Sequence, residues 1–279
     1  MELPVDAPQV IEYCCNLCGG KNRLESQYFH RELATCKKCG ANARFRGIIH
    51  VLGSLLGEKE DNPLQKWPRR RHISGMGMSD WPGYANLLMK KFSYENTFYD
   101  RRPQLDIMNL PEKYLGKYDF VISTDVFEHI LAPVQEGFDN LLRLLKPGGH
   151  LVFSVPYTRI PETVEHFPGL QDYEIFTFRG EKIIVNRGPD GRLQVYDNLV
   201  FHGGPGTTLE MRRFCETDVL NRLTQAGFED IQVYDQPQLS IGYYWPELKS
   251  AYVDVPSLYG YILSARRPMP GPVYRVPHN

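Results

Sequence analysis

The feature that most limits the fold of this chain is an alternation of short β-rich runs with helical stretches, which begins after Pro68 and continues almost to the C-terminus. Strands that alternate with helices form βαβ units, in which neighbouring strands lie parallel. The expected strands are Arg71–Ser74, Asn96–Tyr99, Gln104–Ile107, Asp119–Ser123, His150–Val155, Asp230–Tyr234 and Gly260–Ala265. The sequence therefore predicts the α/β fold class, with seven mostly parallel strands in one sheet.

Four cysteines precede this alternation in two close pairs. Cys15 and Cys18 form one C-x2-C pair, and Cys36 and Cys39 form a second. Two such pairs at this separation are typical of structural zinc, because four thiolates close a tetrahedron and leave no position open for water or substrate. We expect a small N-terminal zinc ribbon over residues 1–50. Cys14 is an alternative to Cys15 as a ligand, although only Cys15 gives both pairs the same gap.

Composition and charge exclude several classes of protein. The 279 residues carry a net charge of −1, which gives no excess of positive potential to hold a polyanion. No run of about 18 apolar residues could span a membrane, and the first ten residues lack the pattern of a signal peptide. We therefore expect a cytoplasmic protein with no membrane partner. A nucleic-acid partner is not favoured, although six basic residues lie in the expected zinc module: Lys21, Arg23, Lys37, Lys38, Arg44 and Arg46.

Two segments carry a resemblance to a known family. The run from Tyr118 to Ile130 contains Asp125-Val126-Phe127-Glu128-His129, and the run from Leu144 to Pro156 contains Lys146-Pro147-Gly148-Gly149. In this order and spacing they resemble the fourth and fifth strands of the class I S-adenosylmethionine-dependent methyltransferases. The resemblance covers most of the chain from about His72 to Arg267. It implies a Rossmann-like sheet, methyl transfer as the reaction and S-adenosylmethionine as the cofactor.

The resemblance also implies where the cofactor binds. His72–Gly77 is similar to the family's first motif, which makes Ser74, Gly75 and Gly77 candidates, although Ser74 stands where many members have an acidic residue. Either Tyr99 or Asp100 takes the place of the acidic ribose ligand that is common in the family. Ligands of open α/β sheets bind beyond the carboxyl ends of the strands, so the residues after the fourth strand should also face the cofactor. Those residues are Thr124, Asp125 and His129.

Asp106 and Ile107 resemble the family's adenine contacts, in which an aspartate accepts a hydrogen bond from the adenine amino group. The alternative for Asp106 is a turn cap without any ligand.

A long insertion separates the fifth strand from the next expected helix. Ordinary connections are much shorter, and Glu174–Phe178 and Lys182–Asn186 have the pattern of a β-hairpin. We expect a β-rich lid over residues 159–214 that shapes the acceptor site. The methyltransferase core then occupies residues 51–158 and 215–279.

Several residues are candidates for catalysis. If the acceptor is a hydroxyl group, a histidine is suited to remove its proton, and His129, His166 and His202 are candidates, with Tyr157 as a positioning group. The leading hypothesis is transfer to an O or N atom of a small molecule or saccharide in a biosynthetic pathway, with the oligomeric state open. One alternative is an RNA methyltransferase that binds through the zinc module, although no Asn-Pro-Pro-Tyr motif is present. Another is a non-catalytic binding protein with a degenerate cofactor site.

Overall fold

A six-stranded sheet forms the centre of the computed structural model, which describes residues 9–202, 208–245 and 258–271. The strand order is β15-β16-β6-β5-β3-β4, and β3, β4, β5 and β6 pair in parallel. Strand β16 runs antiparallel to both of its neighbours, β15 and β6. The strands span Ser74–Met78 (β3), Ser93–Thr97 (β4), Tyr118–Thr124 (β5), Leu145–Ser154 (β6), Glu229–Tyr234 (β15) and Ile262–Arg266 (β16).

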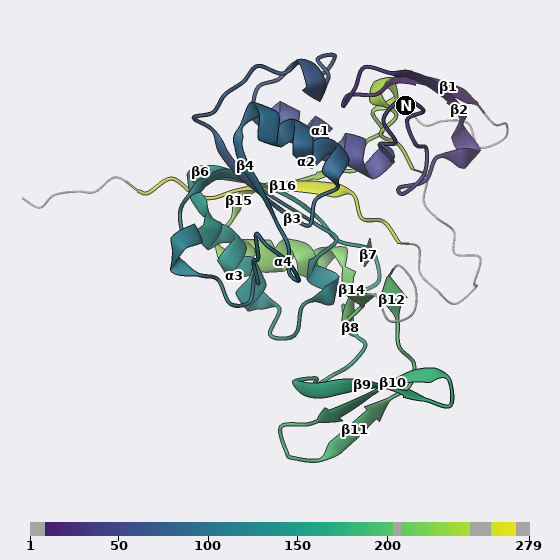
Figure 1. Cartoon of the computed structure of the whole chain (residues 1–279), viewed down its shortest axis with the longest axis vertical. Helices are drawn as coiled ribbons and strands as arrows, with labels where there is room; N and C mark the ends of the chain where they lie inside the picture. Colours follow the sequence, from purple (N-terminus) through teal and green to yellow (C-terminus); the bar gives the residue numbers. More distant parts are fainter. Residues whose placement is uncertain (1–8, 203–207, 246–257, 272–279) are drawn as a thin grey trace, which may run out of the picture.

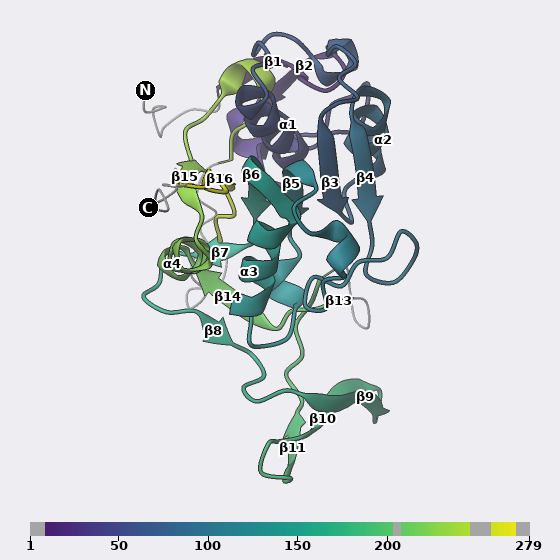
Figure 2. The same ribbon diagram turned by 90° about the vertical axis from the view of Figure 1, so that its left-hand side faces the viewer.

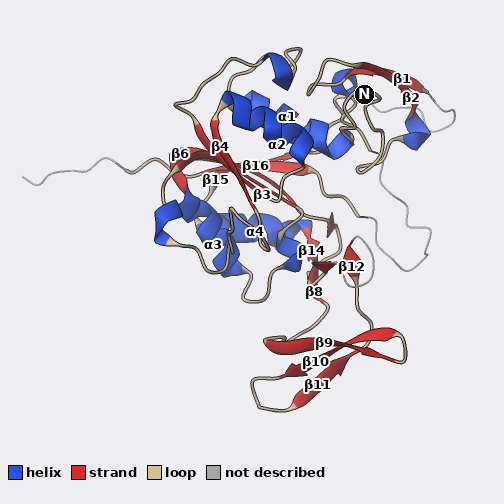
Figure 3. Ribbon diagram, in the orientation of Figure 1, coloured by secondary structure: helices blue, strands red, loops and turns tan. Residues whose placement is uncertain are grey.

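Helices cover both faces of this sheet. Figures 1 and 3 show α1 and α2 on one face and α3 and α4 on the other. Their bounds are Ala43–Leu55 (α1), Pro82–Lys91 (α2), Gln135–Leu144 (α3) and Glu216–Ala226 (α4). Strand β5 follows the period of two that this layering requires: Phe120 and Ile122 pack toward α1 and α2, whereas Val121 packs toward α3 and α4. The predicted α/β class is confirmed.

The expected seventh strand is reduced to one bridge in the described residues. Gln104 pairs with Phe98 in parallel, and Leu105 donates a backbone hydrogen bond of 2.9 Å to the same residue. The pairing then stops, because Asp106 turns the chain: its carboxylate accepts hydrogen bonds from the backbone of Met108 and from the side chain of Asn109. An aspartate that caps a turn in this way competes with a strand ladder.

The first strand of the core is also placed differently from the prediction. The strand expected at Arg71–Ser74 begins at Ser74 and runs to Met78. The glycine-rich run is therefore strand rather than loop. A Cβ atom on Gly75 would lie 2.1 Å from the ring of Phe120, so glycine is required here by close packing between neighbouring strands.

The N-terminal segment shares its core with the sheet. A hairpin of β1 (Val10–Cys14) and β2 (Lys21–Glu25) precedes the 3-10 turn η1 (Ser26–Tyr28). Helix α1 crosses the boundary expected at residue 50, and the buried cysteines belong to the same apolar cluster as α1, α2 and Phe120. We call residues 9–42 the N-terminal module.

The insertion folds into two parts. Near the main sheet, β7, β8 and β14 form a small sheet, and β12 pairs with β13. Further out, β9, β10 and β11 form a three-stranded antiparallel sheet that stands away from the core in both views (Figures 1 and 2). The hairpin expected at Glu174–Phe178 and Lys182–Asn186 is confirmed by the pairing of β9 with β10. The bounds are Tyr157–Thr158 (β7), Val164–Glu165 (β8), Asp172–Phe178 (β9), Glu181–Arg187 (β10), Leu193–Tyr196 (β11), Phe201–His202 (β12), Thr208–Leu209 (β13) and Arg212–Cys215 (β14).

Short 3-10 turns complete the described structure. They are Leu64–Lys66 (η2), Glu112–Tyr114 (η3), Phe127–His129 (η4) and Leu239–Ile241 (η5). Among the described residues, no helix is long and apolar enough to cross a membrane.

Candidate active site

The carboxyl ends of the parallel strands meet at one edge of the sheet. Strand β3 ends at Met78, β4 at Thr97, β5 at Thr124 and β6 at Ser154. In open α/β sheets this edge is where ligands bind. Ser74 lies at the other end of β3, where its hydroxyl group donates to the backbone of Lys117 and to Asp119. The structure therefore places Ser74 at the amino end of β3, away from the edge where Thr124, Asp125 and His129 lie.

Asp80 follows β3 and is buried at this edge, although the sequence analysis did not select it. Its backbone N–H donates to Asn96 Oδ1 and its carbonyl oxygen accepts from Asn96 Nδ2, both at 2.9 Å. Burial raises the pKa of Asp80 to about 7, against the opposing effect of a hydrogen bond from Tyr94 to Oδ2. Tyr84 lies nearby, yet no hydrogen bond of regular geometry reaches Oδ1 from the described residues. Oδ1 is thus a buried carboxyl oxygen whose hydrogen bonding within the described residues is incomplete.

Gly77 provides the space for this carboxyl group. A Cβ atom at Gly77 would lie 2.1 Å from Asp80 Oδ2 and closer still to the Tyr94 hydroxyl. Glycine therefore lets the acidic side chain fold back against its own strand. The absence of a side chain at Gly77 thus allows the Asp80 carboxyl group to lie at this edge of the sheet.

Asp125 follows β5 and is held ionised by two arginines. Arg31 Nη2 lies 2.5 Å from Asp125 Oδ1, and Arg44 Nε lies 3.4 Å from Oδ2. Although burial opposes ionisation, the two guanidinium groups lower the pKa of Asp125 to about 2. Asp125 also has a φ of +55°, a strained conformation for an aspartate, which its backbone N–H stabilises by donating to Ser154 O at 2.8 Å. Arg31 brings the N-terminal module directly to the edge of the sheet.

Glu128 and His129 lie in the turn η4, just beyond Asp125. His129 Nδ1 lies 2.8 Å from the carbonyl oxygen of Leu209, which can only accept, so Nδ1 carries the proton in this contact. The other ring nitrogen, Nε2, lies 3.6 Å from Glu128 Oε1. Glu128 is fully buried, and its burial, together with the negative charge of Asp125, raises the pKa of its carboxyl group well above the usual range. The arrangement leaves Nε2 as the basic nitrogen.

The end of the insertion fixes this turn in place. Arg212, buried and 1% exposed, donates to the carbonyl oxygens of Phe127 and Ile130 at 2.9 and 2.7 Å. Its Nε atom also lies 2.7 Å from Glu165 Oε1. Met211 donates its backbone N–H to Glu128 O at 2.7 Å. The contacts that hold this turn therefore come from β14 and the residue before it, and from Glu165 of β8 through Arg212.

The other expected catalytic residues lie in the insertion or beside it. His166 Nε2 lies 2.7 Å from Glu210 Oε1, and Tyr157 is buried in β7 with its ring stacked on Tyr259 at 6.1 Å. His202 lies in β12, paired with Thr208. Only His129 is carried on the turn that follows a strand of the main sheet.

The remaining cofactor candidates follow β4. Tyr99 is 71% exposed, and Asp100 lies on the surface near Arg101. Both carboxylate oxygens of Asp106 are engaged within its own turn, and the carbonyl oxygen of the neighbouring Ile107 accepts from Asn140 at 2.8 Å. These contacts match the turn cap that was the alternative for Asp106, and its contact with adenine stays a prediction.

Four cysteines could hold a metal ion in the N-terminal module. The sulfur atoms of Cys15, Cys18, Cys36 and Cys39 lie within 4.8 Å of one another, with two separations of 3.7 Å. A zinc ion with Zn–S bonds of ~2.3 Å places tetrahedral sulfurs about 3.8 Å apart. Cys14 is exposed and outside the cluster, as expected.

Both cysteine pairs form the same turn. The N–H of Gly19 donates to Cys15 O and that of Gly40 to Cys36 O, each at 2.8 Å, and both glycines have a positive φ. The donor set and the repeated turn fit zinc.

A comparison with protein families assigns a family to the central part of the chain. Residues 63–186 match the family model described as a methyltransferase domain. No curated protein matches the chain. Similar solved structures include an S-adenosylmethionine-dependent methyltransferase from Mesorhizobium loti, with 14% identity, a TM-score of 0.42 and coverage of 81% of this chain and 99% of that one.

Two further structures are similar at the same level. A 1,6-didemethyltoxoflavin-N1-methyltransferase from Burkholderia thailandensis has 12% identity, a TM-score of 0.40 and coverage of 81% and 78% of the two chains. A sugar N-methyltransferase from Streptoalloteichus sp has 12% identity, a TM-score of 0.43 and coverage of 83% and 89%. Structures this distant say nothing about the substrate of this chain.

Proposed function

This chain is a methyltransferase, and we propose that it moves a methyl group from S-adenosylmethionine to an O or N atom of a small molecule or saccharide. The observation that carries the proposal is the group of acidic and basic side chains at the carboxyl edge of the sheet, within the part of the chain that matches the methyltransferase domain. Asp80, Asp125 and His129 follow β3 and β5 there.

Asp80 is proposed to hold the cationic part of the cofactor. Its Oδ1 atom accepts no hydrogen bond of regular geometry from the described residues, and a buried carboxylate oxygen without such a bond is costly unless a ligand compensates it. S-adenosylmethionine carries a positively charged sulfonium and an α-ammonium group, and its sulfonium supplies the leaving group for methyl transfer. The expected contacts of Gly75, Gly77, Tyr99, Asp100, Asp106, Ile107 and Thr124 with the cofactor remain part of the proposal.

His129 is proposed as the base that takes the proton of the acceptor. Its tautomer is fixed by the hydrogen bond to Leu209, so that Nε2 can accept a proton as the acceptor oxygen or nitrogen bonds to the methyl carbon and the carbon–sulfur bond breaks. The neighbouring Glu128 carboxyl group, whose pKa burial raises, would stabilise the positive charge gained by the ring when it is itself ionised. His166, His202 and Tyr157 are proposed to help place the acceptor from the insertion.

The N-terminal module is proposed to hold structural zinc through its four cysteines. A closed tetrahedral site folds a segment and leaves no position for catalysis. The module would then act on the site through Arg31, which reaches Asp125.

Calorimetric titration with S-adenosylmethionine tests the proposal. The zinc-loaded protein should bind the cofactor, and Asp80→Asn should weaken binding about tenfold or more, since it removes a charge-assisted contact. Ser74→Ala serves as the control, because Ser74 lies at the far end of β3, and should bind as the parent does. Absence of binding by the parent protein would contradict the proposed cofactor.

A further inference from the structure

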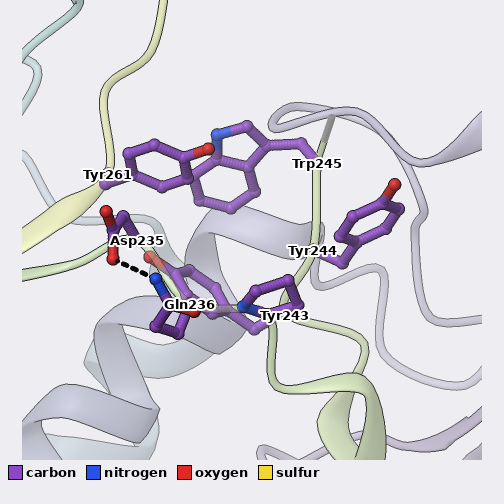
Figure 4. A pocket seen from close by; sticks show the side chains of 7 residues that line it. Asp235, Gln236, Tyr243, Tyr244, Trp245 and Tyr261 are labelled. Carbon is purple, nitrogen blue, oxygen red and sulfur yellow. Dashed lines mark hydrogen bonds between the residues drawn. The ribbon is translucent and has the colours of Figure 1, made fainter. Parts of the chain in front are cut away.

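A small aromatic cavity lies at the same edge of the sheet as the candidate site. It is lined by Tyr243, Tyr244, Trp245 and Tyr261, together with Asp235 and Gln236 (Figure 4). Asp235 directly follows the last residue of β15, and Tyr261 directly precedes the first residue of β16. Because β16 runs against the other strands, its first residue lies at their carboxyl ends.

Two contacts connect the cavity with the candidate site. Arg31, which pairs with Asp125, also donates from Nε to the carbonyl oxygen of Gly260 at 3.2 Å, next to Tyr261. A row of aromatic rings, Tyr157, Tyr259, Tyr261 and Trp245, runs from the end of β6 to the cavity with centroid separations of 6.1, 6.0 and 5.4 Å. A ligand in the cavity therefore lies beside the edge where methyl transfer is proposed.

The cavity has the size of one ring. Its volume is about 200 Å³, and a protein cavity of ~150 Å³ is enough to hold benzene. Aromatic rings form most of its wall: Trp245 and Tyr261 stack on each other at 15° with centroids 5.4 Å apart, and Tyr243 meets Trp245 edge-on with centroids 4.9 Å apart. A wall of packed aromatic rings suits the apolar surface of a six-membered ring.

The polar groups of the cavity determine which hydrogen-bonding groups a bound ring must carry. Asp235 can only accept hydrogen bonds, and it already receives one of 2.8 Å from Gln236 Nε2. The indole N–H of Trp245 is buried and has no hydrogen-bond partner in the part of the chain that the structure describes. A ligand that satisfies both must donate to a carboxylate and accept from an indole. Hydroxyl groups do both, whereas an ammonium group only donates and a hydrocarbon ring does neither.

We propose that this cavity binds a hydroxyl-bearing six-membered ring of the acceptor, with Trp245 and Tyr261 against the ring and Asp235 accepting from its hydroxyl groups. This proposal rests on the proposed methyl transfer and gives its acceptor a chemical class. It places the ring between the N-terminal module and the ends of β15 and β16, because Tyr244 also packs on Phe29 of the module at 5.7 Å.

Nuclear magnetic resonance of the indole N–H groups provides the test. The chain has three tryptophans, and Trp245→Phe identifies the resonance of the one in the cavity. Trp67 is an internal control, because its indole N–H already donates to Asn62 O at 2.8 Å away from the cavity. The probes are methyl β-D-glucopyranoside, methyl β-D-galactopyranoside and myo-inositol, each at up to tens of millimolar, with tetramethylammonium chloride as the cationic probe without a hydroxyl group.

We expect at least one hydroxylated ring to shift the Trp245 resonance with saturation and to leave that of Trp67 unchanged. Asp235→Asn should weaken this binding about tenfold, since it removes a charged acceptor. Asp230→Asn is the matched control and should bind as the parent does, because Asp230 pairs with Arg266 outside the cavity.

Three results would overturn the proposal: a response to tetramethylammonium without a response to the rings, equal shifts of all tryptophans, or no saturable shift with any ring. A titration of the same sample with S-adenosylmethionine separates the two proposals. Cofactor binding without ring binding rejects the cavity alone, whereas ring binding without cofactor binding rejects the methyl donor.

Discussion

The N-terminal module and the β9–β11 sheet are both additions to the same α/β core, yet they are built in opposite ways. The module packs its hairpin and cysteines into the apolar cluster shared with α1, α2 and the main sheet. The β9–β11 sheet instead exposes one apolar face, on which Phe178, Leu193 and Val195 are about 60% exposed. One addition is part of the main core, whereas the other packs through Ile184 into a smaller apolar cluster with Leu209 and Met211.

Polar contacts show the same difference. At the boundary of the module, the fully buried Arg46 of α1 donates to the carbonyl oxygens of Ala34 and Ala41 in the module and of Gly242, so it joins segments almost 200 residues apart. In the β9–β11 sheet, the buried Asn186 bonds to Gly169 and Gln194, which both lie within the insertion. We conclude that damage to the module should reach the candidate site, whereas changes on the outer sheet should stay local.

The largest expected effect comes from removing a cysteine of the cluster. Cys36→Ser should lose the proposed metal ion and much of the folding of the module, because structural zinc contributes on the order of 10 kcal/mol to small zinc domains. Thermal unfolding followed by circular dichroism, with zinc content measured by mass spectrometry, checks this result. Cys14→Ser is the control, and a Tm equal in both variants would show that the module does not depend on metal.

A smaller but still large effect is expected at Arg46. Arg46→Met should destabilise the protein by about 3 kcal/mol, because three buried carbonyl oxygens lose their donor. Urea unfolding measures this difference. Arg23→Met is the matched control on the exposed surface of the module, and the comparison fails if the two variants lose the same stability.

The link between the module and the candidate site can be tested at Arg31. Arg31→Met leaves Asp125 with the more distant Arg44 alone, so the pKa of Asp125 should rise and the ionised carboxylate should be less stable. Stability that depends on a lowered carboxyl pKa is present above about pH 4 and is lost as the pH falls toward about pH 2. The variant should therefore show a smaller loss of stability over this range than the parent, in unfolding curves at several pH values. Identical pH profiles would mean that Arg31 does not control Asp125.

The smallest effect is expected on the outer sheet. Phe178→Thr and Val195→Thr should each change the free energy of unfolding by no more than about 0.5 kcal/mol, because the side chains are exposed. Cofactor affinity measured by calorimetry should be unchanged. A clear loss of cofactor affinity in either variant would show that changes in the outer sheet reach the candidate site, as changes in the module are expected to do.

The sequence predicted well those parts that depend on local patterns. The two cysteine pairs, the segments around β5 and β6 and the β9–β10 hairpin each carry their signal within a short stretch of chain. The first core strand was misplaced, because two glycines in a short run are typical of a loop. These glycines leave room for the side chains of Phe120, Tyr94 and Asp80, and contacts between neighbouring strands cannot be predicted from a short run of sequence.

One local signal in the sequence points to Asp80 as a site residue. Proline is favoured at the first position of a helix, so Pro82 predicts that a helix begins there and that the preceding strand ends shortly before it. Asp80 then lies between the strand and the helix, where ligands of α/β sheets bind. Arg31 offered no such signal. It meets Asp125 across 94 residues of sequence, and only the packing of the module against the sheet brings them together.

The pH dependence of cofactor binding tests the central claim most directly. Affinity for S-adenosylmethionine should rise about tenfold between about pH 6 and about pH 8 in the parent protein, because Asp80 ionises near pH 7 and only its charged form attracts a cation. In Asp80→Asn this rise should be absent. The same rise in the variant, or no change with pH in either protein, would contradict the assignment of Asp80 to the cofactor.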